Sequence, residues 1–218
     1  MKTNYWLAGL SIVVAIAFVA PRVAAQAPNM AHTHIGHVMT SFADTPDKGG
    51  LLPTTAAEAQ TAAQHAGLAA KATGNLATMK LHAGHVLQCL DPTLEAMGPC
   101  RGYGVKKGAA AALNHVGLAA KVDTASAGVK LHSTHVSTSL NNVITWTDAA
   151  TAAAQKLRAS NSADEATKLA AELQMDTSMI VAGMDTNKDG QVGWQAGEGG
   201  LQQATLHMQL MMKGEGIQ

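Results

Sequence analysis

The sequence predicts an all-α fold: a pseudo-symmetric four-helix bundle made of two repeated helical hairpins, followed by a C-terminal helix–loop–helix. Three observations support this class. Aromatic residues make up only 3% of a chain rich in alanine and glycine, which suits closely packed helices better than sheets. Residues 65–86 and 115–136 are identical at twelve of 22 positions without a gap. No segment shows the apolar–polar alternation that indicates a β-strand.

The N-terminus has the organisation of a secretory signal peptide over residues 1–25. Lys2 is followed by an apolar run over residues 7–20 and by the small-residue stretch "PRVAAQA", with cleavage expected after Ala25. The apolar run is too short to span a bilayer, and no later segment is long and apolar enough. We therefore expect a periplasmic or secreted protein without a membrane span after cleavage.

The expected mature chain is nearly neutral and has two cysteines. Loss of Lys2 and Arg22 leaves 13 basic residues against 15 acidic ones, and the absence of basic clusters argues against nucleic-acid binding. In an exported protein, Cys89 and Cys100 are expected to form one disulfide that closes a short loop. The motif "CxxCH" does not occur, so covalent attachment of a c-type haem is not indicated.

Helix start and stop signals divide the mature chain into a histidine-rich bundle over 26–158 and a helix–loop–helix over 160–218. Capping boxes are expected at Thr55–Glu58 and at Ser162–Glu165. Pro92 ends the second helix. The repeated hairpins cover residues 58–90 and 108–140. The expected helices cover residues 53–72, 76–90, 105–122, 127–144, 163–183 and 198–214. Whether the fourth of them continues to residue 159 is left open.

Each repeat carries the motif "HxxHV", preceded at the same distance by a third histidine. The two sets are His65, His82, His85 and His115, His132, His135. In each hairpin the three histidines lie nine, eight and eleven residues from the turn, so they are nearly level on two antiparallel helices. The i, i+3 pair shares one helix face. If both turns lie at the same end of the bundle, all six histidines form one layer with two three-histidine sites.

These histidines predict a transition-metal site. Neutral imidazole binds zinc, copper and nickel well, and three protein ligands with one open position are typical of catalytic or exchangeable metal sites. Carboxylates are scarce nearby, which argues against a carboxylate-bridged di-iron centre. A third "HxxHV", containing His34 and His37, is expected to cap or extend the layer. His207 is assigned a structural role. His32 is interpreted either as an exposed neighbour or, because it is close to His34 in the sequence, as a residue that helps to capture the metal.

The leading functional hypothesis is binding of copper or zinc for metal handling, storage or delivery, with the metal ion and another periplasmic metal or redox protein as partners. One alternative is a non-covalent haem protein, because small residues beside the histidines leave room for a macrocycle. Another is a dinuclear copper redox protein, since two three-histidine sets resemble type 3 copper centres in ligand count. A structural or interaction module with incidental histidines is a third. No nucleophile–base–orienter set indicates an enzyme.

The segment "DTNKDGQVGWQAGE" at 185–198 resembles an EF-hand calcium loop. Gly190 falls at position 6, where the motif needs a sharp turn. The sequence departs from the motif at position 12, where Ala196 replaces the expected glutamate. The resemblance implies a calcium ion that serves as a structural clip in an exported protein. The implied ligands are Asp185, Asn187, Asp189, Gln191 and, two residues beyond position 12, Glu198.

Overall fold

The computed structural model describes residues 1–2 and 29–217, and this part of the chain confirms the all-α prediction. Apart from its first two positions, the expected signal peptide lies outside the described residues. None of the described helices is both long enough and apolar enough to cross a membrane. The described elements are α1 (Met30–Met39), the 3₁₀ turn η1 (Pro46–Lys48), α2 (Leu51–Lys71), α3 (Leu76–Leu90), α4 (Val105–Lys121), α5 (Ala127–Ala159), α6 (Ala163–Ala182) and α7 (Leu201–Gly214).

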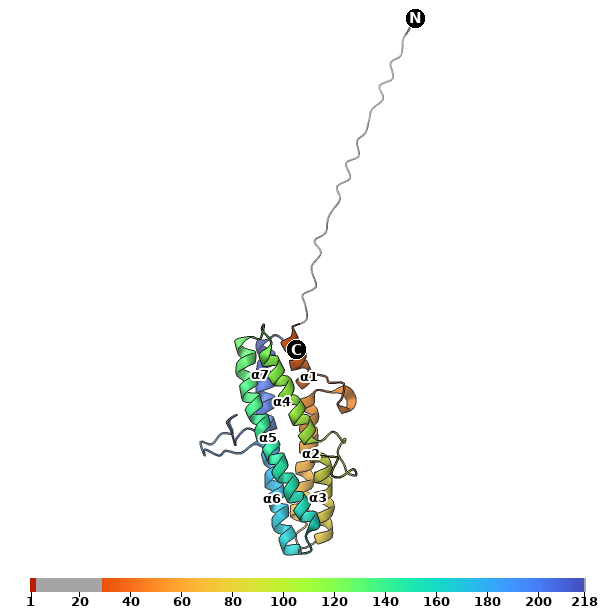
Figure 1. Cartoon of the computed structure of the whole chain (residues 1–218), viewed down its shortest axis with the longest axis vertical. Helices are drawn as coiled ribbons and strands as arrows, with labels where there is room; N and C mark the ends of the chain where they lie inside the picture. The colour runs from red at the N-terminus through yellow and green to blue at the C-terminus, as the bar shows by residue number, and fades with distance from the viewer. Residues whose placement is uncertain (3–28, 218) are drawn as a thin grey trace.

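The helices build an elongated bundle whose two ends contain different helices (Figure 1). At one end α2, α3, α5 and α6 pack together, and at the other end α1, α4, α5 and α7 do so. Only α5 runs through both ends. It has 33 residues, which corresponds to about 50 Å at ~1.5 Å per residue. The continuation of the fourth expected helix to residue 159, left open by the sequence, is therefore realised.

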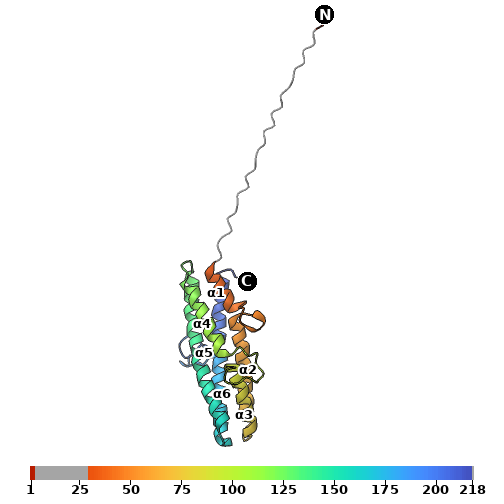
Figure 2. The same cartoon turned by 45° about the vertical axis from the view of Figure 1, so that its right-hand side comes forward.

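Three connecting loops carry the chain onward from one end of the bundle to the other. The first loop (40–50) joins α1 to α2, the second (91–104) joins α3 to α4, and the third (183–200) joins α6 to α7. As a result the α2–α3 turn and the α4–α5 turn lie at opposite ends (Figures 1 and 2). The expected arrangement, with both turns at one end, needs a second loop that reverses the chain; this loop instead lets α4 continue in the direction of α3.

The core is built largely from small residues that let helices approach closely. A β-carbon on Gly108 of α4 would lie 2.1 Å from the Oγ1 of Thr55 on α2, so only glycine fits this crossing. Larger apolar side chains fill the spaces between the alanines; among the fully buried ones are Leu90, Leu140 and Ile180. The close α2–α4 contact fixes where the two ends of the bundle meet.

The second connecting loop is fastened at two points. Cys89 and Cys100 form the predicted disulfide. Glu58 of α2 is 1% exposed, and its carboxylate accepts backbone N–H groups of Arg101 at 3.3 Å, Tyr103 at 2.8 Å and Gly104 at 3.4 Å. A buried carboxylate needs such donors, so Glu58 and the loop stabilise each other.

The C-terminal helices belong to the bundle rather than standing apart from it. α6 packs against α2 and α5, and α7 packs mainly against α5. α6 begins as predicted, because the Ser162 side chain accepts the backbone N–H of Glu165 at 3.3 Å. α1 was not expected as a helix; it starts where the side chain of Asn29 accepts the N–H of Ala31 at 3.0 Å.

Candidate metal sites

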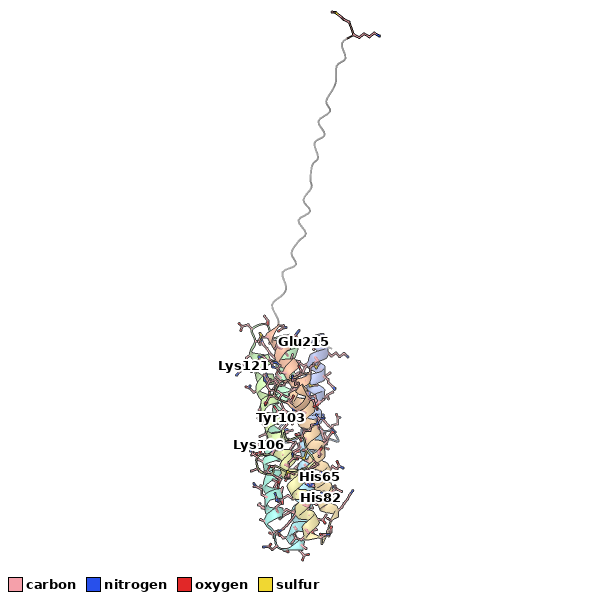
Figure 3. The ribbon with its side chains drawn as sticks, turned by 90° about the vertical axis from the view of Figure 1, so that its right-hand side faces the viewer. His65, His82, Tyr103, Lys106, Lys121 and Glu215 are labelled. Carbon is pink, nitrogen blue, oxygen red and sulfur yellow. A yellow bond between two sulfur atoms is a disulfide. The ribbon has the colours of Figure 1, made fainter. Side chains whose placement is uncertain are left out.

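Nine of the ten histidines gather into three clusters of three. We name each cluster after the helices that form it. The α2–α3 site contains His65, His82 and His85; the α1–α4 site contains His34, His37 and His115; the α5–α7 site contains His132, His135 and His207. Within each cluster, one nitrogen from every ring lies within 4.8 Å of the others. Figure 3 shows His65 and His82 side by side, far from Glu215 near the other end of the bundle.

Each cluster combines one "HxxHV" helix with a neighbouring helix that contributes a single histidine. The valine that ends each motif is fully buried: Val38, Val86 and Val136. The residue after each single histidine is buried too: Ala66, Val116 and Met208. Because each histidine precedes a core residue, its ring lies at the edge of the buried stripe, in the groove between two helices. Eight of the nine histidines are accordingly half-buried, and the ninth, His207, is the most deeply buried of them.

In every cluster the Nδ1 atoms converge on the single histidine. The Nδ1 of His65 lies 3.0 Å from that of His82 and 3.1 Å from that of His85. The Nδ1 of His115 is 3.0 Å from His34 and 3.4 Å from His37.

The α5–α7 site repeats this geometry. The Nδ1 of His207 is 3.1 Å from His132 and 3.4 Å from His135. Three independent helix pairs thus produce the same arrangement of donor atoms.

These spacings match those of ligands around one metal ion. Two nitrogens bound at ~2.0–2.1 Å in a tetrahedral site lie about 3.3 Å apart. A neutral imidazole Nδ1 either donates or accepts one hydrogen bond, so three converging Nδ1 atoms cannot all be satisfied by one another. A cation between them would satisfy all three lone pairs. Each cluster could hold one metal ion through three nitrogens, with a fourth position left open.

The electrostatics of the clusters favour neutral, metal-ready imidazoles. Burial, followed by the neighbouring rings, lowers the pKa of His65 and of His115. The effect is largest at His207, where burial and then His135 and His132 lower the pKa from the ordinary value of 6.5 to about 4. Burial is also the main cause of the lowered pKa values of His34, His82 and His135. Neutral rings present the lone pairs that a metal requires.

Two of the sites have an aromatic side chain against their imidazoles. The ring of Trp194 stacks on His135 with centroids 3.9 Å apart and an interplanar angle of 19°. The ring of Phe42 meets His37 and His115 edge-on, at centroid distances of 5.4 and 5.1 Å. Both aromatic residues come from connecting loops. Within the described residues, the rings of the α2–α3 site pair with no aromatic ring outside their own cluster.

The structure brings together some expected site residues and separates others. His65, His82 and His85 form the expected set, because one tight hairpin contains them all. His115 does not lie with His132 and His135.

His34 and His37, expected to cap or extend the histidine layer, instead form a separate site with His115. The unexpected partner of His132 and His135 is His207, which had been assigned a structural role. One signal pointed to it: His65, His115 and His207 are each followed three residues later by leucine.

Two residues near the sites have other roles. His32 belongs to no cluster; its Nε2 lies 2.9 Å from the Oε2 of Glu215. Met79, three residues before His82, is fully buried in the core. Met79 therefore fills space between helices instead of facing a histidine cluster.

The segment resembling a calcium loop forms the middle of the third connecting loop. The carboxylate of Asp185 accepts the backbone N–H groups of Asp189 at 3.2 Å and Gly190 at 3.0 Å. Gly190 has a φ of +88°, the conformation that position 6 needs. Glu198 is 4% exposed and accepts the N–H groups of Asn187 and Gly193. Asp185, Asp189 and Glu198 are not among the clusters within 4.8 Å found in the described part of the chain.

Comparison with known proteins adds no family to this description. No known protein family, curated protein or solved structure matches the chain. Its function must therefore be argued from the sites themselves.

Proposed function

We propose that this protein binds three transition-metal ions, zinc or copper, one in each three-histidine cluster, for metal handling, storage or delivery. The observation that carries the proposal is the convergence of three Nδ1 atoms at three separate helix pairs, where the two outer atoms lie 3.0–3.4 Å from the central one. Incidental histidines have no reason to repeat such a geometry. An all-imidazole ligand set favours zinc, copper or nickel over calcium and magnesium.

The ligand set also favours binding over redox chemistry on a large cofactor. A bis-histidine haem has its two axial imidazoles on opposite sides of its plane, and in each cluster two Nδ1 atoms lie within 3.4 Å of the third, which leaves no space between them for a macrocycle. Three neutral ligands do not compensate the charge of a divalent ion, so water or an anion would fill the open position. Such a site can release its metal to a partner with stronger ligands, for example another exported metal protein.

A titration of the metal-free protein tests this function. Zinc or cuprous ion is added in the presence of a competing chromophoric chelator, and bound equivalents per chain are counted. Three equivalents are expected for the unchanged protein and none for His65→Ala/His115→Ala/His207→Ala. The matched control is His32→Ala, which removes a histidine outside the clusters and should keep three. Retention of tight binding in the triple variant would refute the proposal.

A second candidate function, a structural calcium ion in the third connecting loop, is supported by the backbone geometry around Asp185. The turn at Gly190 and the inward position of the Glu198 carboxylate are those expected of an EF-hand-like loop. Addition of calcium should raise the melting temperature of the unchanged protein and leave that of Asp185→Asn/Asp189→Asn unaffected. Equal melting with calcium and with a calcium chelator would refute this candidate.

A further inference from the structure

The three sites differ in what covers them, and the differences come from the three connecting loops. The first loop places Phe42 at the α1–α4 site, and the third places Trp194 at the α5–α7 site. The second loop places no aromatic ring on the α2–α3 site. A hollow of about 440 Å³, lined by Leu81, His85, Met97 and Arg158 among others, adjoins that site instead.

Phe42 is held in place by its own loop. Its backbone N–H donates to the carbonyl of Gly49 at 3.0 Å, and its carbonyl accepts the Oγ1 of Thr45 at 2.8 Å. Thr45 is 5% exposed, and the Phe42 side chain packs against the core. The ring therefore has a fixed position against His37 and His115 and is not a freely moving surface group.

Trp194 is held by α5, the same helix that bears the histidine it covers. The Asn142 side chain donates to the carbonyls of Gln195 at 2.8 Å and Gly199 at 3.1 Å, and accepts the N–H of Gly197 at 2.8 Å. Asn142 lies two helical turns after His135, so both residues are on one face of α5. This clamp fixes the loop, and with it the indole, over His135.

The second loop is also fastened, but its residue Met97 extends into solvent and does not cover the histidines. Glu95 forms an ion pair with Arg158 of α5, and the disulfide holds Cys100. Met97, between these two anchors, is 78% exposed. The hollow beside His85 is not enclosed but opens to solvent, so an incoming ligand can enter it.

We infer that the three sites divide the work: the α2–α3 site exchanges metal with the surroundings, and the two aromatic-covered sites retain it. This inference rests on the proposed function. Release of a metal to a chelator begins when the new ligand reaches the open coordination position. Apolar groups around a site control that access, so a fixed ring over the imidazoles slows exchange, whereas the uncovered site exchanges quickly.

The test measures how zinc leaves the fully loaded chain when excess chelator is added. One equivalent should leave in a fast phase and two in a slow phase. His65→Ala should remove the fast phase and keep the slow one. Phe42→Ala and Trp194→Ala should each accelerate one slow equivalent at least about tenfold, whereas Trp194→Phe, which keeps a stacking ring, should retain most of the slow behaviour.

The possible results distinguish the inferred difference in metal exchange between the sites from the proposed metal binding itself. Three equivalents that leave in one phase, or a fast phase that persists in His65→Ala, would overturn the division while leaving metal binding intact. Unchanged slow phases in both Phe42→Ala and Trp194→Ala would overturn it as well. A chain that binds no zinc at the clusters would overturn the proposed function itself. Melting curves of each variant establish that the compared proteins are folded.

Discussion

The Nδ1 atoms of His132 and His207 lie 3.1 Å apart, although 75 positions separate the two residues in the chain. This contact joins α5 to α7, so the "HxxHV" motif of the second repeat pairs with a histidine on a helix outside the repeat. Its counterpart joins His34 and His115, 81 positions apart, at 3.0 Å. The metal sites therefore depend on how the two ends of the bundle are assembled, and the grouping of ligands can be tested by combining substitutions.

Paired substitutions distinguish the observed grouping from the repeat-based one. His132→Ala/His207→Ala removes two ligands of one site and should lower the metal content by one equivalent. His115→Ala/His132→Ala removes one ligand from each of two sites and should lower it by two. Both are counted by elemental mass spectrometry after dialysis. A loss of only one equivalent in the second variant would show that His115 and His132 bind the same metal ion.

Two glycines of α4 should respond to alanine in opposite directions. Gly108→Ala places a β-carbon 2.1 Å from the Oγ1 of Thr55, and overpacking of this kind costs about 1–3 kcal/mol. Gly117→Ala meets nothing within 4 Å, and alanine in a helix interior should stabilise by about 0.5–1 kcal/mol. Chemical denaturation of both variants measures the difference. Equal stability of the two would show that α2 and α4 do not cross this closely.

The stability of the metal-free protein should fall as the pH drops below the ordinary histidine pKa. His207 has a pKa of about 4 in the folded chain, below its ordinary value of 6.5, so the unfolded chain binds more protons between these values. The stabilisation of the folded chain by neutral His207 is therefore complete above about pH 6.5 and is lost as the pH falls towards about 4. When both proteins are denatured at pH values across this window, the free energy of unfolding of His207→Gln should change less with pH than that of the unchanged protein. An identical dependence in the two proteins would contradict the lowered pKa.

The disulfide should stabilise the fold without taking part in metal binding. It joins residues eleven positions apart, and a loop of this size contributes roughly 2–3 kcal/mol through restriction of the unfolded chain. Cys89→Ala/Cys100→Ala should lose about this much free energy of unfolding and still bind three metal ions. A loss of metal at unchanged helicity would instead make the two cysteines part of a metal site.

The sequence predicts best what one local hairpin determines. His65, His82 and His85 could be grouped because the tight turn between α2 and α3, where Gly74 has a φ of +78°, fixes the register of both helices. The partners of His115 could not be predicted, because they depend on whether residues 91–104 reverse the chain or carry it onward. Helix propensity and capping leave that choice open; the contacts of Glu58 with the loop and the Gly108–Thr55 crossing belong to tertiary packing.

The ligand role of His207 could not be predicted either, because it also depends on tertiary packing. Its ligand role depends on α7 lying beside the first half of α5, which no local pattern around residue 207 indicates. The leucine three residues after each single histidine was the available signal, and it is weak because leucine is frequent in helices. Trp194 and Phe42 lacked any signal, since they reach the sites from loops whose paths are set by Asn142 and Thr45.

The central claim is that each of three histidine clusters holds one metal ion. The most direct test is a crystal of zinc-loaded protein measured at the zinc absorption edge. Three anomalous peaks are predicted, each between the Nδ1 atoms of one cluster: His65/His82/His85, His34/His37/His115 and His132/His135/His207. Peaks at other positions, or clusters without a peak at saturating zinc, would contradict the account.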